Sequence, residues 1–200
     1  MFTEPQIRRS SAEEPFTGWI EVICGCMFSG KTEELIRRLN RALIARQPVR
    51  IFKPKTDNRY HPENVVSHNN NSIDSLSVVQ ASDILSQVQN CHVVGIDEAQ
   101  FFDPDIVAVC NTLANRGKRV IVAGLDMDYE GKPFGPMPYL MAVAEYVTKV
   151  HAICAVSGNP ASFSYRLGAS QEQLNVGAYE LYEARSRRYF YQPHDQPPDA

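Results

Sequence analysis

A glycine-rich run near the N-terminus is the feature that most constrains this chain. It consists of Gly25, Cys26, Met27, Phe28, Ser29, Gly30, Lys31 and Thr32. The run fits G-x-x-x-x-G-K-[ST], a pattern in which glycines let the backbone curl and point several N–H groups at an anion. We expect it to bind nucleotide phosphates, with Lys31 reaching the β- and γ-phosphates and the Thr32 hydroxyl binding Mg²⁺.

The residues on either side of this run place it between a strand and a helix. Residues 19–24 are an apolar stretch bounded by Gly18 and Gly25, which is typical of a buried strand. Downstream, apolar residues such as Leu35 and Leu39 recur at helical spacing. The order strand, glycine loop, helix favours phosphate binding over a simple glycine turn with a solvated lysine.

Composition limits the class of protein. The chain has 200 residues, 44% of them hydrophobic, which suits one α/β domain with a small appendage. Its formal net charge is −3 and no Lys/Arg run is present, so we expect no nucleic-acid partner. It contains no apolar stretch of membrane-spanning length and no apolar signal-peptide core. We therefore expect a cytoplasmic protein without a membrane partner, whose five cysteines are reduced.

Short apolar runs alternate with helical patterns along the rest of the chain. The expected strands are residues 49–52, 76–79, 91–96 and 119–124. The expected helices are residues 82–89, capped by Ser82, and residues 103–115, capped by Asp103. This alternation predicts a P-loop NTPase-type α/β fold, a parallel sheet flanked by helices, with ligands at the carboxyl ends of the strands.

The expected domain organisation has a large and a small part. Residues 18–150 form the P-loop α/β nucleotide-binding domain, and residues 151–191 form a small C-terminal domain. The polar or proline-rich ends, residues 1–17 and 192–200, are expected to be disordered tails. Within the larger domain, the polar residues 57–75 are expected to form a long mobile loop.

Two adjacent acids follow the expected strand 91–96. Asp97 is expected to hold Mg²⁺ opposite Thr32, although an Asp after a strand can also be a turn or cap residue. Glu98 is expected to orient an attacking hydroxyl and accept its proton, the alternative being a surface carboxylate. Phe101 and Phe102 come next; such aromatics are more often core, but they can stack on a flat ligand.

The combination of motifs resembles the type II, or cellular-type, thymidine kinases over residues 18–191. Beyond the glycine run, the resemblance is carried by Asp97-Glu98-Ala99-Gln100-Phe101-Phe102 and Lys132-Pro133-Phe134-Gly135. It implies a small C-terminal domain whose lasso loop closes over the nucleoside. It also implies transfer of the γ-phosphate of ATP to the 5′-hydroxyl of thymidine, giving dTMP for nucleoside salvage and DNA synthesis. Members are usually homotetramers inhibited by dTTP.

The resemblance also implies roles for individual residues. Glu98 is the general base. The nucleotide-binding set, besides the glycine run, is Asp57, Asn58, Arg59, Asp97, Glu98, Ala99 and Gln100. The thymine pocket is lined by Met27, Phe101, Leu125 and Tyr129, with Ser164 nearby. The lasso segment that binds the base through its backbone is Leu174, Asn175, Val176, Gly177 and Ala178, and Tyr182 meets the deoxyribose.

The chain departs from this family in the C-terminal domain. The family usually has a structural zinc held there by two Cys-x-x-Cys pairs, which here read Cys154-Ala155-Val156-Ser157 and Ser186-Arg187-Arg188-Tyr189. Only Cys154 remains, and neutral serine hydroxyls are poor zinc ligands, so we expect no zinc. Residues 151–191 are rich in Phe and Tyr, and we expect an aromatic mini-core in place of the metal, with Tyr189 near Cys154.

Two other functions are compatible with parts of the sequence. A regulatory module could use the glycine run as a nucleotide switch without nucleoside kinase activity. A nucleoside kinase with an altered base preference is the second. Glu98 and the aligned pocket residues favour the thymidine kinase, because a pure switch needs neither.

Overall fold

A parallel six-stranded sheet forms the centre of the computed structural model, which describes residues 18–55, 64–66, 72–167 and 181–192. Its strands are β1 (Trp19–Cys24), β2 (Val49–Pro54), β5 (Leu76–Val78), β6 (Val93–Ile96), β7 (Arg119–Gly124) and β8 (Tyr146–Lys149). Their order across the sheet is β5-β2-β6-β7-β1-β8. The helical segments around it are α1 (Lys31–Ile44), η1 (Ala81–Asp83), α2 (Ile84–Gln87), η2 (Ala99–Phe101), α3 (Ile106–Asn115) and α4 (Met137–Val143).

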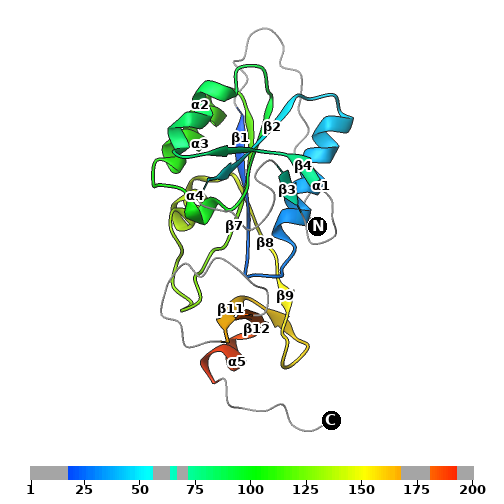
Figure 1. Ribbon diagram of the computed structural model, residues 1–200, viewed down its shortest axis with the longest axis vertical. Coiled ribbons are helices and arrows are strands. Elements are labelled where there is room, and N and C mark those ends of the chain that lie inside the picture. Colours follow the sequence, from blue (N-terminus) through cyan, green and yellow to red (C-terminus); the bar gives the residue numbers. More distant parts are fainter. Residues whose placement is uncertain (1–17, 56–63, 67–71, 168–180, 193–200) are drawn as a thin grey trace.

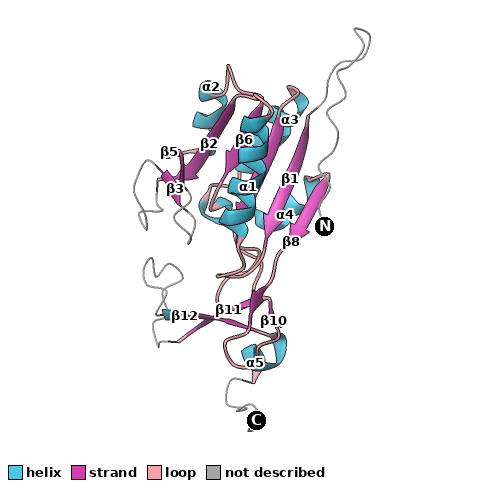
Figure 2. Cartoon of the chain, turned by 90° about the vertical axis from the view of Figure 1, so that its right-hand side faces the viewer, coloured by secondary structure: helices cyan, strands magenta, loops and turns pink. Residues whose placement is uncertain are grey.

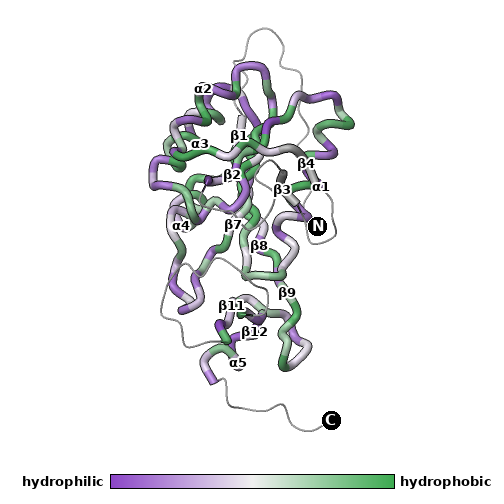
Figure 3. Tube along the Cα trace, in the orientation of Figure 1, coloured by the Kyte–Doolittle hydropathy of each residue, from purple (hydrophilic) through white to green (hydrophobic). Residues whose placement is uncertain are grey.

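Helices cover both faces of the sheet. Figures 1 and 2 show α1 on one face, with α2, α3 and α4 on the other. The apolar stripe of α1, which includes Leu35 and Leu39, packs on Ile121 of β7. On the opposite face, Ile106 and Leu113 of α3 belong to a second cluster. Both faces of the central strands are therefore buried, which explains why these strands are mostly hydrophobic in Figure 3. The predicted α/β fold with a parallel sheet flanked by helices is confirmed.

Three central strands end at the same edge of the sheet. Cys24 at the end of β1 lies opposite Gly124 at the end of β7. Ile96 at the end of β6 lies opposite Val122 of β7. The segments that follow these strands therefore leave the sheet next to one another, as expected for a binding site in a parallel sheet.

Part of the expected long loop at residues 57–75 forms strands instead. β3 (Asn64–Val66) and β4 (Ser72–Asp74) pair antiparallel, with Val65 opposite Ile73. These β-branched residues favour a strand, but each strand has only three residues, which is too short for an alternating sequence pattern to be recognised. Residues 56–63 and 67–71 lie outside the described part of the chain, as do residues 1–17 and 193–200 of the two expected tails.

The expected helix beginning at Ser82 is wrong in its start and its length. Ser82 lies inside the 3₁₀ turn η1, and α2 ends at Gln87. Gln80 caps the turn, and its backbone N–H donates to the Asp83 carboxylate at 3.1 Å. The helix expected from Asp103 also begins later, at Ile106, and its N-cap is Asp105; Asp103 accepts the backbone N–H of Asp105 at 3.1 Å in the turn before it. Both helices therefore begin at other residues than the sequence predicted, because other residues cap them.

A small C-terminal module lies beyond the carboxyl edge of the sheet, where β8 runs into it (Figure 1). Its elements are β9 (Ala152–Ile153), β10 (Pro160–Ala161), β11 (Phe163–Arg166), β12 (Tyr182–Arg185) and α5 (Arg187–Tyr191). β9 pairs with β10 and β11 pairs with β12, both antiparallel. Cys26 of the glycine run packs in the same buried cluster as Cys154 and Tyr189. The module therefore shares its core with the phosphate-binding loop.

A buried ion network fixes α1 on the sheet. Glu21 of β1 has no exposed side-chain surface and accepts hydrogen bonds from Arg38 of α1 at 2.8 Å and Arg119 of β7 at 2.6 Å. Trp19 Nε1 donates to the same carboxylate at 2.7 Å. Arg38 is also fully buried and donates to Thr148 of β8 at 3.0 Å. Burial of these charges is tolerated because each is paired and hydrogen-bonded.

We predict that Glu21→Gln lowers the free energy of unfolding by about 3 kcal/mol or more, because it removes the fully buried negative charge that the guanidinium groups of Arg38 and Arg119 share. Glu34→Gln is the matched control, since Glu34 also pairs with Arg38, at 2.8 Å, but is 20% exposed. Its loss should cost about 1 kcal/mol or less. Urea unfolding of both variants measures the difference. Equal losses would show that the buried carboxylate has no special role.

Candidate functional site

The glycine run forms a tight loop between β1 and α1, as predicted. Gly25 has a φ of 150°, and a Cβ added there would lie 2.2 Å from the carbonyl oxygen of Val150. Gly30 has a φ of 80° and directly precedes the first residue of α1. A residue with a side chain is excluded at the first position by contact and strained at the second by its backbone conformation. The loop therefore depends on both glycines.

Lys31 folds back onto its own loop. Its ammonium donates to the carbonyl oxygen of Cys26 at 2.7 Å, and the Ser29 hydroxyl donates to the same oxygen at 2.7 Å. Burial lowers the pKa of Lys31, and the carboxylates of Glu98 and Asp97 oppose that shift. An anion in the loop would add negative charge beside the ammonium and offer it a stronger acceptor than a carbonyl. The arrangement is suited to binding phosphate.

The loop meets the end of β6 through Thr32 and Asp97. The Thr32 hydroxyl lies 3.4 Å from Asp97 Oδ2, while Asp97 Oδ1 accepts the backbone N–H of Glu98 at 3.0 Å. Asp97 is only 7% exposed. A hydroxyl and a carboxylate oxygen this close are the hard oxygen ligands that Mg²⁺ prefers, so the residues fit the predicted metal. The structure therefore brings together the two residues that the sequence assigned to Mg²⁺.

Glu98 is held in an unusual backbone conformation beside this pair. Its φ is 51°, in the left-handed region that non-glycine residues rarely adopt. Gln100 Nε2 donates to Glu98 Oε2 at 2.5 Å, and Gln100 Oε1 accepts the backbone N–H of Leu125 at 2.9 Å. Gln100 is 3% exposed and connects the end of β6 to the end of β7. In this geometry Gln100 orients Glu98, and Ala99 is fully buried in the core.

Asp126 is a site residue that the sequence reasoning missed. It follows β7, is 6% exposed, and pairs with Lys149 at the end of β8 at 2.6 Å. Its Oδ1 has no hydrogen-bond partner in the described part of the chain. Its charge also opposes the lowering of the pKa of Lys31 by burial, together with Glu98 and Asp97. The signal was present, because Asp126 lies two residues after the buried strand 119–124, close to the carboxyl edge of the sheet.

The predicted nucleoside residues come from several elements. Ser164 of β11 is 4% exposed, and its hydroxyl accepts the backbone N–H of Met27 at 3.0 Å, which attaches the C-terminal module to the phosphate-binding loop. Phe101 makes an edge-to-face contact with Phe134, at a centroid distance of 5.6 Å. Phe134 is a second residue absent from the predicted site, although the motif 132–135 contains it.

Leu125, Tyr129 and Tyr182 complete the part of the predicted pocket that the structure describes. Leu125 is 9% exposed at the carboxyl edge of the sheet. Tyr129 and Tyr182 are brought together by Arg166, which contacts both rings. The remaining predicted residues lie outside the described part of the chain; they are Asp57, Asn58, Arg59, Leu174, Asn175, Val176, Gly177 and Ala178.

Only one of the four positions at which the family usually holds zinc has a usual zinc ligand here, Cys154; the other three are Ser157, Ser186 and Tyr189. Burial alone would raise the pKa of the Cys154 thiol, but hydrogen bonds from the Ser157 hydroxyl and from the backbone N–H groups of Ser186, Ser157 and Val156 lower it to about 6. Tyr189 is 6% exposed and packs in the cluster with Cys154. Among the described residues, no group of three or more His, Cys, Asp or Glu side chains could hold a metal.

Aromatic and guanidinium groups pack beside this cluster. The rings of Phe163 and Phe190 stack at 4.6 Å, and Tyr191 meets Phe190 edge-on at 5.1 Å. The guanidinium of Arg185 lies 3.6 Å from the ring centroid of Tyr165, and its Nη1 donates to the carbonyl oxygen of Tyr189. These contacts join β11, β12 and α5. The positions of the family's second ligand pair, Ser186 and Tyr189, are the N-cap of α5 and a residue within it.

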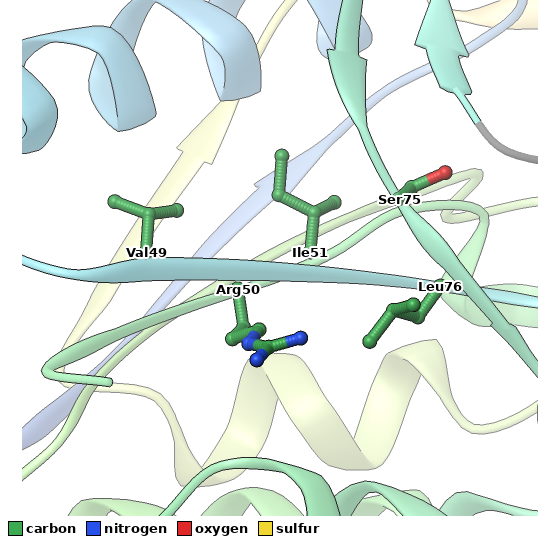
Figure 4. Close-up of a pocket in the computed structure, with 5 residues that line it drawn as sticks. All are labelled: Val49, Arg50, Ile51, Ser75 and Leu76. Carbon is green, nitrogen blue, oxygen red and sulfur yellow. The ribbon is translucent and has the colours of Figure 1, made fainter. Parts of the chain in front are cut away.

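A separate hollow of about 220 Å³ lies at the β5 edge of the sheet. Figure 4 shows Val49, Arg50 and Ile51 of β2 with Ser75 and Leu76 around it. Val49–Ile51 belong to the first half of β2, away from the carboxyl edge where the phosphate-binding loop lies. The hollow is therefore not part of the candidate site.

Comparison with known proteins gives one consistent result. The family model described as thymidine kinase matches residues 18–190. A thymidine kinase of Rhodothermus sp. (strain ITI 518) is 58% identical over 190 residues, covering 95% of this chain and 88% of that protein. A thymidine kinase of Bacteroides fragilis (strain YCH46) is 53% identical over 190 residues, covering 95% and 94%. One of Bdellovibrio bacteriovorus is 52% identical over 181 residues, covering 90% and 89%.

Proposed function

The chain belongs to the thymidine kinase family, and we propose on that premise that it transfers the γ-phosphate of ATP to the 5′-hydroxyl of thymidine. The product is dTMP, formed by salvage of the nucleoside for DNA synthesis. The observation that carries the proposal is the position of Glu98 beside both Asp97 and the phosphate-binding loop. Phosphoryl transfer to an alcohol requires a phosphate-binding loop, an acidic metal ligand and a base next to one another, as these residues are.

The phosphate-binding loop holds the triphosphate of ATP in this proposal. Backbone N–H groups of residues 25–32 and the N-terminus of α1 face the phosphates, and Lys31 leaves the Cys26 carbonyl to bind them. Thr32 and Asp97 would hold Mg²⁺, which neutralises charge on the phosphates when bound. Their 3.4 Å separation supports that assignment.

Glu98 acts as the general base. As the 5′-oxygen of thymidine forms its bond to the γ-phosphorus, the hydroxyl proton passes to the Glu98 carboxylate. The bond between that phosphorus and the β–γ bridging oxygen breaks, and its electron pair leaves with ADP. Gln100 supports this role by donating to Glu98 Oε2, which holds the carboxylate in place beside the phosphate-binding loop.

The nucleoside lies between the sheet and the C-terminal module in this proposal. Met27, Phe101 and Leu125 offer apolar surface to the thymine base, and Tyr129 offers an aromatic face. The hydrogen bond between Met27 and Ser164 supports this arrangement because it joins the two parts that contact the nucleoside. Tyr182 contacts the deoxyribose. The assigned roles of residues 57–59 in nucleotide binding and of residues 174–178 in base binding stay predictions.

The activity is tested by incubating the chain with γ-labelled ATP, magnesium and a panel of nucleosides. We expect labelled dTMP from thymidine. Glu98→Gln should keep ATP binding and lower turnover about 100-fold or more, because it removes only the base. Lys31→Ala, the contrasting variant, should weaken ATP binding about tenfold or more as well as turnover.

Two results would contradict this proposal. Binding of ATP by the wild-type chain without phosphorylation of any nucleoside would favour the regulatory nucleotide-binding module instead. Full turnover by Glu98→Gln would show that another group accepts the proton.

Stability without zinc is a further part of the proposal. The buried cluster that contains Cys154 and Tyr189 supports it, because this packing joins the two segments that a metal would otherwise connect. The stacking of Phe163 on Phe190 also attaches α5 to β11. We predict that the purified chain contains far less than stoichiometric zinc and that a chelator leaves its melting temperature unchanged. Near-stoichiometric zinc in elemental analysis, or melting on chelation, would contradict the prediction.

We also propose that the chain assembles as a homotetramer. β8 lies at one edge of the sheet, and its Val147 is 45% exposed. Tyr139 of α4 is 68% exposed and adds apolar surface. Exposed edge strands of this kind readily pair with another chain. Light scattering should give a mass of four chains of 22.5 kDa, whereas a monomer would refute the assembly.

Two remaining expectations concern regulation and location. Inhibition by dTTP and a cytoplasmic location both stay predictions. No helix in the described ranges is both long and apolar enough to cross a membrane.

A further inference from the structure

Arg166 is a buried residue at which three parts of the C-terminal half meet. It is the last residue of β11 and is 9% exposed. Its guanidinium lies 3.7 Å from the ring centroid of Tyr129, in the segment that follows β7. Its Nε and Nη2 donate to the hydroxyl oxygen of Tyr182 at 3.0 Å and 2.6 Å. One planar group therefore stacks on one tyrosine and hydrogen-bonds the other.

The backbone around Arg166 is held in place by the pairing of β11 with β12. Arg166 lies directly opposite Tyr182 in the β11–β12 ladder. The next backbone pair is also closed, because the N–H of Leu167 donates to the carbonyl oxygen of Leu181 at 2.9 Å. The guanidinium thus extends from a fixed point on the module toward the segment after β7.

The segment that carries Tyr129 is also ordered by local hydrogen bonds. The Asp128 carboxylate accepts the backbone N–H groups of Glu130 at 2.9 Å and Lys132 at 3.0 Å. Met127 forms an antiparallel bridge with Pro133. Neither set of bonds reaches the C-terminal module. Arg166 is the described contact that joins Tyr129 directly to β11 and Tyr182.

The chemistry of these contacts gives each tyrosine a defined orientation. The Nε and Nη2 groups of Arg166 both donate to the hydroxyl oxygen of Tyr182. This oxygen is therefore the acceptor, and the hydroxyl proton of Tyr182 must point to another acceptor. The guanidinium covers one face of the Tyr129 ring, so a flat ligand can stack only on the opposite face. A rigid planar fork can make both contacts at once, which a lysine ammonium cannot do.

We infer that Arg166 is a positioning residue that sets the affinity for the nucleoside by holding Tyr129 and Tyr182 in one arrangement. Tyr182 is oriented as a hydrogen-bond donor toward a sugar oxygen, and Tyr129 is oriented as an aromatic surface for the base. This inference rests on the proposed function, since it concerns the nucleoside half of that site. Arg166 itself contacts neither the phosphate-binding loop nor Glu98 through any of these bonds.

Steady-state kinetics with thymidine and ATP tests the inference. Arg166→Gln should raise the KM for thymidine about tenfold, the effect of losing a charge-assisted hydrogen bond, while the KM for ATP changes less than about twofold. Arg166→Lys should not restore the KM for thymidine, because it keeps the charge without the planar fork. Arg187→Gln is the matched control: Arg187 lies over the Phe163 ring at 5.0 Å in the same module, and its loss should leave both KM values unchanged.

A double-mutant cycle separates positioning from a general structural role. If Arg166 acts through Tyr182, the variant carrying both Arg166→Gln and Tyr182→Phe should lose little more kcat/KM for thymidine than the worse single variant. Additive losses would overturn the inference, as would equal increases in both KM values or full rescue by lysine. A wild-type chain that phosphorylates no nucleoside would overturn the proposed function together with this inference. An active wild type with an unchanged Arg166→Gln would overturn the inference alone.

Discussion

The in-register pairing of β6, β7 and β1 is the constraint on which the rest of the structure depends. Because all three strands are parallel, their carboxyl ends meet at one edge. Gly25 and Asp97 follow directly after β1 and β6, and Asp126 follows β7 after Leu125. A slip of one residue would turn every side chain of a strand to the opposite face. Glu21 would then leave its two arginines, and α1 would lose the charges that fix it above the sheet. Core packing and site geometry therefore depend on the same ladder.

The C-terminal module is coupled to the phosphate-binding loop at two points. Cys26 packs in the core of the module, and the backbone of Met27 donates to Ser164. The loop proposed to bind phosphate and the module proposed to contact the nucleoside therefore share a buried cluster and a hydrogen bond. Arg166 extends this coupling from the module to Tyr129 in the segment after β7. The proposed nucleoside site is thus assembled from chain segments far apart in sequence.

Sequence reasoning was most accurate where a residue's role follows from its neighbours along the chain. The predicted strands at residues 19–24 and 119–124 match β1 and β7, because near-continuous apolar runs bounded by glycine or polar residues leave little ambiguity. The helix expected to begin at Ser82 was wrong because residues 81–83 form a 3₁₀ turn. The Asp83 carboxylate stabilises this turn by accepting the backbone N–H of Gln80. The strands β3 and β4 were missed because each arm has only three residues.

The amino-acid sequence by itself determined the strand–loop–helix unit, the fold class, and the pairing of Thr32 with Asp97, because these follow from local spacing and from the rule that ligands bind at strand ends. Only the tertiary structure decided that Gln100 holds Glu98, that Asp126 pairs with Lys149, and that Arg166 joins two tyrosines. The contacts of Gln100 with Leu125, of Asp126 with Lys149 and of Arg166 with the two tyrosines connect residues on different elements. Their distances are set by sheet register and helix packing, which no local pattern of residues specifies.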